Sequence, residues 1–360
     1  MTKRIAVIGI VGLPSNYGGF ETMVDNVTKK LYKSYNFTVY CSSKAYSEKL
    51  NSYNNCNLKY INLKANGLQS IFYDFFSMID AIKHADILLI LGVSGCIFLP
   101  FIKLISNKRI IVNIDGMEWK RPKWNIFVRF FLRLSEIIAV YFADELIADN
   151  RAIVKYLRNT YNKSSNFIAY GGDHAKKIKT TSDLKKKYNF ISNPYALKVC
   201  RIEKENNIEM ILKVFSNYHC KNLVVIGNWQ NSFYGKNLYQ KYMSYENIHL
   251  LHSIYDSKIL NQIRSNCEIY IHGHSAGGTN PSLVEAMNLG LPIFSFKVSY
   301  NIETTANKAK YFNSCEELLE LLKKTKEKEL YFLGEEMHNI AKNIYSWNKI
   351  STEYKNIFEK

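Results

Sequence analysis

The chain lacks the cysteine patterns of disulfide-rich and zinc-binding folds. It has seven cysteines, an odd number, and none of them forms a C-x-x-C pair. They are scattered along the chain, mostly among apolar neighbours: Cys41, Cys56, Cys96, Cys200, Cys220, Cys267 and Cys315. A reducing cytoplasm fits this usage better than a disulfide framework.

Long apolar runs are also missing. The first residues, MTKRIAVIGIVG, have neither the apolar core nor the small-residue cleavage site of a secretory signal peptide. The uncharged stretch ILLILGVSGCIFLPFI at 87–102 has 16 residues, whereas a membrane-spanning helix needs about 20. Because glycines and a proline interrupt it, we expect a buried strand, a turn and the start of a helix there.

Neither standard nucleotide-binding fingerprint is present after the first predicted strand. The segment GIVGLPSNYGGFE at 9–21 matches neither G-x-G-x-x-G nor the P-loop pattern. It does place Gly18 and Gly19 directly before a predicted helix. Glycines allow close approach of a ligand and helix N-termini present free N–H groups, so a diphosphate could bind here. A plain strand-to-helix turn is the alternative.

Positive charge, by contrast, is abundant. Lys and Arg number 48 against 31 Asp and Glu, which gives a net charge of +17. This excess favours anionic partners. Nucleic acid, an anionic membrane surface and a phosphorylated substrate all remain open on charge alone.

The apolar pattern predicts an α/β fold built twice. Apolar strand-like runs alternate with helical spacing from Arg4 to Ala148, and the alternation restarts at Tyr195. Such alternation is typical of doubly wound parallel sheets. We therefore expect an N-terminal domain at 1–170 and a C-terminal domain at 171–340. The final helices from Glu316 onward, and a C-terminal helix at 341–360 in particular, are expected to pack back on the first domain.

A second glycine loop lies in the second domain, in HGHSAGGTNPSLVEAMNLG at 272–290. Either Thr279 or Asn280 suits the N-cap of a helix that starts at Pro281. Glu285 lies one turn into that helix, on the side of the loop. It could form a capping box with Ser282, or it could accept hydrogen bonds from a sugar diol.

Four segments then carry a resemblance to a known family: GLPSNYGGFET (12–22), NIDGMEWKRPKW (113–124), VCRIEKENN (199–207) and GGTNPSLVEAMNLGLPIFSF (277–296). The chain resembles glycosyltransferase family 4, and within it the bacterial rhamnosyltransferases that build capsules, O-antigens and wall polysaccharides. The resemblance implies the GT-B architecture, with two doubly wound Rossmann-like domains facing a cleft. It also implies a nucleotide-sugar donor, retention of anomeric configuration and no required metal.

The resemblance assigns roles to particular residues. Glu285 is expected to bind the donor ribose, and Arg201 the diphosphate. Gly18 and Gly19 are expected to close over the diphosphate from the first domain. Gly277, Gly278, Thr279 and Asn280 are expected to lie along the diphosphate and the sugar. Apart from the resemblance, His274 is also expected to contact the donor sugar or phosphate, because it shares one side of a predicted strand end with His272. A zinc site at His272 and His274 is not expected, because no further ligands stand at a suitable spacing.

Two positions depart from the family pattern. Gly277 stands where many relatives carry a second Glu, and Asn206 stands where many carry a Lys. One acidic contact to the sugar and one cationic contact to phosphate are thus missing, although Lys204 could supply the latter. The loss is consistent with a deoxy-sugar, which offers fewer hydroxyl groups.

Asp115, at the end of a predicted strand, is the candidate catalytic base, unless it only caps a loop. Glu118 is either an alternative base or a contact to the acceptor sugar. Arg201 is expected to stabilise the leaving diphosphate, with a surface ion pair to Glu203 or Glu205 as the alternative.

The stretch WKRPKWNIFVRFFLR at 119–133 interleaves aromatic and basic residues. It could lie on an anionic membrane, stack on single-stranded nucleic acid or form a buried helix with solvated lysines. With the resemblance in view, we expect Glu118, Trp119 and Arg121 to contact the acceptor, and no nucleic-acid partner.

The sequence therefore predicts a glycosyltransferase on the cytoplasmic face of the plasma membrane. The expected reaction transfers rhamnose from dTDP-rhamnose to a lipid-diphosphate-linked saccharide. The alternatives are a UDP- or GDP-hexose donor, or a non-catalytic protein that binds nucleic acid or anionic lipid.

Overall fold

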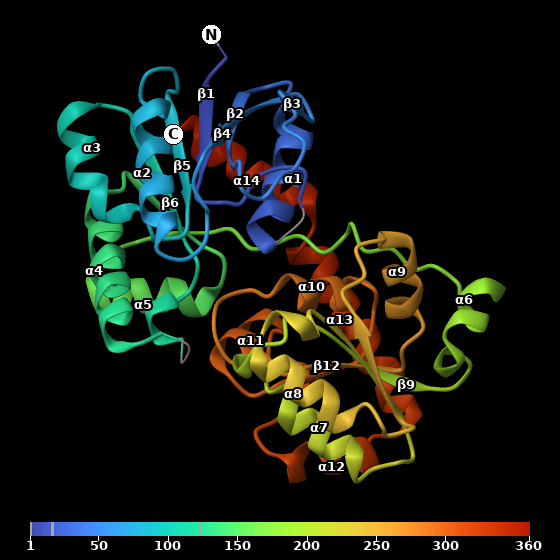
Figure 1. The fold of residues 1–360 in the computed structure, drawn as a ribbon. Coiled ribbons are helices and arrows are strands. Elements are labelled where there is room, and N and C mark those ends of the chain that lie inside the picture. Colours follow the sequence, from blue (N-terminus) through green and yellow to red (C-terminus); the bar gives the residue numbers. More distant parts are fainter. Residues whose placement is uncertain (1, 16–17, 122–123) are drawn as a thin grey trace. The chain divides into compact units, whose positions relative to one another are not determined.

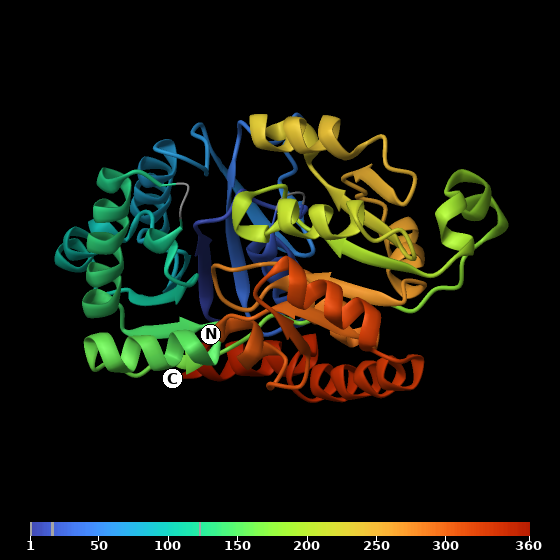
Figure 2. The ribbon, with the colours of Figure 1, turned by 90° about the horizontal axis from the view of Figure 1, so that it is seen from below.

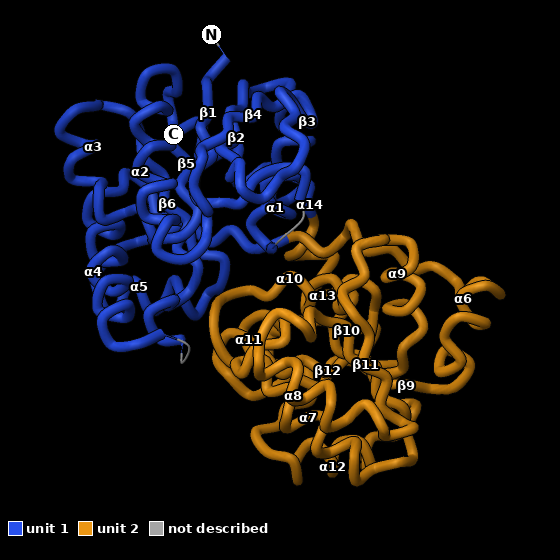
Figure 3. Tube along the Cα trace, viewed as in Figure 1, with its two compact units in different colours: residues 1–170, 347–360 blue, residues 171–346 orange. Residues whose placement is uncertain are grey.

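The computed structural model describes residues 2–15, 18–121 and 124–360. Residues 16–17 and 122–123, which belong to two of the quoted motifs, lie outside the described part. The chain divides into two compact units (Figure 3). Unit 1 comprises residues 1–170 and 347–360, and unit 2 comprises residues 171–346.

Unit 1 is built on a sheet with the strand order β3-β4-β2-β1-β5-β6-β7-β8 (Figure 1). All neighbouring pairs are parallel except β3 and β4. The strands are β1 (Arg4–Ile8), β2 (Asn36–Ser42), β3 (Ser52–Tyr53), β4 (Cys56–Ile61), β5 (Ile87–Leu91), β6 (Arg109–Ile114), β7 (Glu145–Ala148) and β8 (Asn166–Phe167). Every residue of β5 is buried, as expected for a parallel strand covered on both faces.

The helices of unit 1 pack against this sheet and against one another. They are α1 (Gly19–Leu31), α2 (Gln69–Ala81), α3 (Leu99–Ile105), α4 (Ile126–Phe142), α5 (Arg151–Tyr161) and α14 (Trp347–Glu359), with the 3₁₀ turns η1 (Cys96–Phe98) and η2 (Glu118–Lys120). The stretch at 87–102 forms β5, η1 and the start of α3, as the sequence predicts. No helix of the described ranges is long and apolar enough to cross a bilayer.

The last helix of the chain, α14, completes unit 1 (Figure 2). It packs on α1, and the Phe358 ring lies 5.4 Å from that of Tyr35. The Asn113 amide at the end of β6 donates a hydrogen bond to the Tyr354 hydroxyl at 3.1 Å. Lys3 Nζ donates to the Phe358 carbonyl at 2.6 Å, which ties α14 to the segment before β1.

Unit 2 has a parallel sheet with the order β11-β10-β9-β12-β13-β14. Its strands are β9 (Tyr195–Val199), β10 (Asn222–Gly227), β11 (Ile248–His252), β12 (Ile269–His272), β13 (Ile293–Phe296) and β14 (Lys310–Phe312). Its helices are α6 (Ser182–Lys187), α7 (Ile208–Ser216), α8 (Phe233–Tyr242), α9 (Ser257–Ser265), α10 (Pro281–Asn288), α11 (Ser299–Thr304), α12 (Cys315–Lys324) and α13 (Glu327–Ile344). Three 3₁₀ turns are η3 (Asn189–Ser192), η4 (Lys204–Asn206) and η5 (Trp229–Asn231).

The expectation that the helices from Glu316 onward cross to the first domain is wrong for α12 and α13. Both belong to unit 2, and α13 packs along α10. Gly334 of α13 approaches the Gly290 backbone so closely that a Cβ there would collide with it. The segment 341–360 is therefore not one helix, because α13 ends at Ile344 and α14 begins at Trp347.

Each sheet has one point at which the order of crossovers reverses. In unit 1 it lies between β1 and β5, and in unit 2 between β9 and β12. Ligands of open α/β sheets bind outside the carboxyl ends of the strands at such a point. The loops that follow β1, β5 and β6 in unit 1, and β9 and β12 in unit 2, are thus the places to look for a site.

Candidate active site

In unit 1, the predicted glycine pair opens the first helix. Gly18 is the N-cap of α1 and Gly19 its first residue. Glu21, in the first turn, is 4% exposed, and its Oε1 accepts a hydrogen bond from the Val11 N–H at 2.8 Å. A Cβ on Gly18 would lie 3.0 Å from Glu21 Oε2. The carboxylate thus ties the loop after β1 to α1, a function that the sequence analysis missed.

The predicted base and acceptor residues lie together on the loop after β6. Asp115 follows directly on the strand, and Gly116 turns the chain with a φ of +61°. Glu118 forms an ion pair with Arg121 at 2.6 Å and accepts a hydrogen bond from Trp124 Nε1 at 3.1 Å. Arg121 is only 7% exposed. Glu118 and Arg121 therefore hold each other in place, and this restricts what either can offer to a ligand.

Trp119 lies in a cluster of cationic and aromatic side chains. The Arg133 guanidinium stands 4.5 Å from the centre of its ring, and Lys120 Nζ stands 5.2 Å away. The Trp119 indole N–H is buried and has no hydrogen-bond partner among the described residues. Arg133 also donates to the Tyr156 hydroxyl at 2.5 Å, which in turn donates to buried Glu136. The network fixes Trp119 within the loop that carries Asp115.

In unit 2, Arg201 follows β9 at the crossover point. Its side chain is exposed, and among the described residues it has no ion pair with Glu203 or Glu205. The turn behind it is fixed by Asn206, whose amide donates to the Arg201 carbonyl at 2.9 Å. An unneutralised guanidinium at the carboxyl end of a parallel strand is well placed for a phosphate group.

The loop from β12 to α10 uses a backbone conformation that favours glycine. Gly277 has a φ of +111°, which residues with a Cβ rarely adopt. Asn280, not Thr279, is the N-cap, and its Oδ1 accepts from the Ser282 N–H at 3.1 Å. Gly278 and Thr279 are buried beside it. This end of α10 presents backbone N–H groups beside a glycine loop, a geometry that suits anions.

His274 lies on the same loop but is 7% exposed. Its Nδ1 is 3.1 Å from Asn206 Oδ1, and its carbonyl accepts from the Asn301 amide at 2.8 Å. Asn206, which replaces the family's lysine, thus connects the loop after β9 to the loop after β12. The described residues contain no group of three His, Cys, Asp or Glu side chains that could hold a metal ion.

Glu285 is held by two partners that the sequence analysis missed. Its Oε2 lies 2.5 Å from Arg264 NH2 of α9, and its Oε1 lies 2.8 Å from His174 Nε2. Burial would raise the pKa of Glu285, but the charge of Arg264 and the hydrogen bond from His174 outweigh it and lower the pKa. The capping-box interpretation with Ser282 is wrong, because Asn280 caps the helix. A carboxylate has about four lone-pair sites, so each Glu285 oxygen retains capacity for a ligand hydroxyl.

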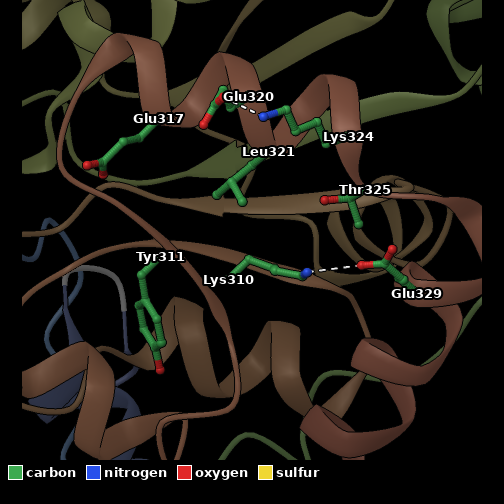
Figure 4. A pocket seen from close by; sticks show the side chains of 8 residues that line it. All are labelled: Lys310, Tyr311, Glu317, Glu320, Leu321, Lys324, Thr325 and Glu329. Carbon is green, nitrogen blue, oxygen red and sulfur yellow. Dashed lines mark hydrogen bonds and ion pairs between the residues drawn. The ribbon is translucent and has the colours of Figure 1, made fainter.

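A different pocket of unit 2 is formed by β14 and the helices α12 and α13, with a cavity volume of about 370 Å³ (Figure 4). Its charged groups are already paired, Lys310 with Glu329 at 3.0 Å and Lys324 with Glu320 at 2.5 Å. It lies at the β14 edge of the sheet, away from the crossover point at β9 and β12. This pocket does not contain any of the predicted site residues.

Comparison with known proteins separates the two halves of the chain. Residues 2–173 match a family described as a domain of unknown function, and residues 180–347 match the family described as glycosyl transferases group 1. The chain is a glycosyltransferase. An uncharacterized glycosyltransferase of Methanocaldococcus jannaschii is 23% identical to it, and the match covers 95% of each chain.

Solved structures resemble this glycosyltransferase over its whole length. Sucrose-phosphate synthase from Thermosynechococcus elongatus matches with a TM-score of 0.82 at 13% identity, covering 99% of this chain and 98% of that one. The Anabaena protein HepE in complex with UDP and glucose matches with a TM-score of 0.78 at 13% identity, over 100% of both chains. At such identity the likeness shows the fold, which is of the GT-B type.

Proposed function

We propose that this glycosyltransferase moves a sugar from a nucleotide-sugar donor to a lipid-diphosphate-linked saccharide, with retention and without a metal. Rhamnose from dTDP-rhamnose is the favoured donor. The observation that carries the donor half of the proposal is the environment of Arg201, an unpaired guanidinium beside the carboxyl end of β9. The sequence resemblance supports the assignment to the rhamnosyltransferase-like branch of family 4.

The chemistry follows from the charge that develops on the leaving group. As the bond between the sugar and the diphosphate breaks, the departing nucleoside diphosphate gains negative charge. Arg201 and the backbone N–H groups at the start of α10 stabilise that charge without reorganising, which lowers the barrier to transfer. Glu285 binds the ribose through lone pairs that Arg264 and His174 leave available.

The acceptor hydroxyl must lose its proton as it attacks. Asp115, which follows directly on β6, is the candidate for the base, while Glu118 contacts Arg121 and Trp124 through its two oxygens. Trp119 offers a flat apolar surface and a buried indole N–H on the same loop, which suits one face of an acceptor sugar. Glu118 and Arg121 then act mainly by fixing this loop.

The absence of a second carboxylate in the donor site favours a deoxy-sugar. Gly277 provides no carboxylate for the sugar hydroxyls, and a 6-deoxy sugar presents fewer of them. A UDP-hexose is the alternative donor, since HepE has been crystallised in complex with UDP-glucose. GDP-hexoses remain a further alternative. A screen of dTDP-, UDP- and GDP-sugars with analysis of the products decides between them.

Calorimetry with dTDP, UDP and GDP tests the donor half directly. One nucleoside diphosphate should bind saturably, and Arg201→Gln should weaken that binding roughly tenfold to hundredfold, because a hydrogen bond to a charged group contributes about 1.5–3 kcal/mol. Lys236→Gln, which removes an exposed cation on α8 of the same unit, is the matched control and should have little effect. Wild-type affinity in the Arg201 variant would exclude this site.

An apolar face on unit 1 supports the membrane half of the proposal. We define the three-helix face as the exposed apolar side chains on α3, on α4, and on and just before α2: Leu68, Phe72, Phe76, Phe101, Leu104, Ile105, Ile126, Phe127, Phe130 and Leu134. Phe75 of α2 packs on Phe101 of α3, and α3 packs on α4, so the three helices that carry these side chains are neighbours. Large exposed apolar surface marks interaction sites.

An anionic bilayer is the partner that fits the three-helix face. Exposed Lys64, Lys120 and Arg129 lie next to it in the chain, and the whole protein carries a charge of +17. Apolar side chains that insert below the headgroups and cations that contact them reinforce each other. The enzyme would then sit on the cytoplasmic face of the membrane that holds its acceptor.

Sedimentation with vesicles tests this surface. Phe127→Ser should reduce binding to vesicles that contain phosphatidylglycerol, because it removes a side chain that is 81% exposed on the face. Phe233→Ser is the matched control, since Phe233 of unit 2 is equally exposed at 81%. Equal binding of the two variants would argue against the three-helix face.

A further inference from the structure

A lysine is buried at the crossover point of unit 2. Lys198 is the fourth residue of β9, in the run YALKV, and it is 1% exposed. Among the described residues its ammonium group has no hydrogen bond and no ion pair, and the residue is absent from the resemblance that defines the donor site. An uncompensated buried cation costs several kcal/mol, so its presence calls for an anionic ligand.

The ammonium lies directly behind the donor loop. An ideal Cβ on Gly273 would lie 3.1 Å from Lys198 Nζ, and it would also collide with the Asn206 carbonyl. Gly273 is the first residue after β12 and precedes the loop that leads to α10. Only a residue without a side chain allows the lysine, the turn after β9 and the loop after β12 to meet here.

The neighbours of Lys198 do not neutralise it. His272 is 2% exposed, its Nε2 has no partner in the described chain, and burial together with the charge of Lys198 holds its pKa well below the usual value. Burial raises the pKa of the Cys200 thiol, so that group is not an anion either. Burial lowers the pKa of Lys198 itself. Neither neighbour therefore supplies a negative charge to the Lys198 amine.

Helix α7 adds to the positive potential. It starts at Ile208, and the turn before it contacts Gly273 through the hydrogen bond that the Asn207 amide donates to the Gly273 carbonyl at 2.8 Å. The N-terminus of a helix carries about half a positive charge. Lys198 and the start of α7 thus lie beside the same short stretch of backbone at Gly273.

We propose that Lys198 binds the diphosphate of the donor from beneath the loop at Gly273, and so replaces the lysine that Asn206 displaces. Asn206 cannot do so, because its amide group holds Arg201 and His274 in place. The inference rests on the proposed nucleotide-sugar function. A strand lysine approaches the phosphates from the sheet, whereas Arg201 approaches from the loop after β9, so the two cations act on different oxygens.

Lys198→Met tests the assignment, since methionine fills nearly the same volume without charge. We expect the variant to bind the matching nucleoside diphosphate at least tenfold more weakly than wild type, and to bind the nucleoside without phosphates equally well. Its melting temperature without ligand should equal or exceed that of wild type, because the buried charge is gone. Should the methionine variant not fold, Lys198→Leu provides the same comparison.

Lys221→Met is the matched control. Lys221 is a partly buried lysine of the same unit, but it pairs with Glu268, so its loss should lower the melting temperature and leave diphosphate binding unchanged. Wild-type affinity for the diphosphate in the Lys198 variant would overturn the inference. Absence of any nucleoside diphosphate binding by the wild-type protein would instead overturn the proposed function, so the two failures are distinguishable.

Discussion

Replacing Glu285 should affect both folding and donor binding, and the structure shows how to separate the two effects. The Glu285 carboxylate and the Arg264 guanidinium are 2.5 Å apart, and their side chains are 10% and 8% exposed. Removing one partner of a buried ion pair costs about 3–5 kcal/mol, because the other charge stays buried. For a domain the size of unit 2, that loss lowers the melting temperature by roughly 6–20 °C.

The variants Glu285→Gln and Arg264→Met each break this pair, but only the first removes the ligand contact. We expect both to melt at lower temperature than wild type. The double variant should lose less stability than the sum of the two, since no buried charge is left unpaired. Differential scanning calorimetry measures these three values.

Nucleotide binding, measured well below all melting transitions, then isolates the role of the carboxylate. Glu285→Gln should weaken nucleotide binding roughly tenfold to hundredfold, the value of one hydrogen bond to a charged group. Arg264→Met keeps the carboxylate and should bind nearly as well as wild type. If both variants lost affinity equally, Glu285 would serve only to hold α9 against α10, and its role in ribose binding would be refuted.

Two further predictions concern stability. Asn280→Ala removes the N-cap of α10 and should cost about 1 kcal/mol of unfolding free energy, measured by urea denaturation, and a loss below about 0.3 kcal/mol would contradict the capping role. Asp74 is fully buried against the Gly95 backbone, and burial raises the pKa of its carboxyl to about 8. The protonated form therefore contributes stability that is complete below about pH 4 and is lost as the pH rises toward 8, so Asp74→Asn should stabilise unit 1 by up to about 4 kcal/mol at pH 7 and have little effect near pH 4. A gain that did not depend on pH would point to another cause.

The parallel strands were the part of the fold most accessible from the sequence. The run Ile87–Leu91 is apolar throughout because a parallel strand is buried on both faces, and Gly92 ends it. The strand and helix at 87–102 could be separated for the same reason. The strands β4, β8 and β14 have no such uninterrupted apolar run, and the sequence analysis did not predict them.

Helix α2 could not be read from its pattern, and the reason is physical. It buries Ser70, Asp74 and Ser77 together with Tyr73, Met78 and Ala81, and it exposes Phe72 and Phe76. Apolar side chains thus lie on both faces of the helix, so hydrophobic periodicity does not identify the buried one. The exposed phenylalanines belong to the three-helix face. The same side chains that make the helix hard to predict therefore suggest an interaction surface.

The candidate site could be predicted residue by residue, but its supporting contacts could not. The partners of Glu285 come from α9 and from the loop at His174, which lies 111 positions away in the chain. Their proximity depends on how the elements pack, and no local pattern encodes it. Lys198 is different, because a lysine within an otherwise apolar strand is visible in the sequence itself, without knowledge of distant contacts.

The return of α14 to unit 1 has a consequence for how the polypeptide emerges from the ribosome. Phe358 and Tyr354 close the side of the first sheet at Tyr35 and Asn113, yet they are translated after all of unit 2. Domains generally fold in the order of their synthesis. Unit 1 therefore cannot be completed until unit 2 and α14 have left the exit tunnel, and until then the apolar surface that α14 covers is exposed. We expect nascent chains to recruit a chaperone to their first half.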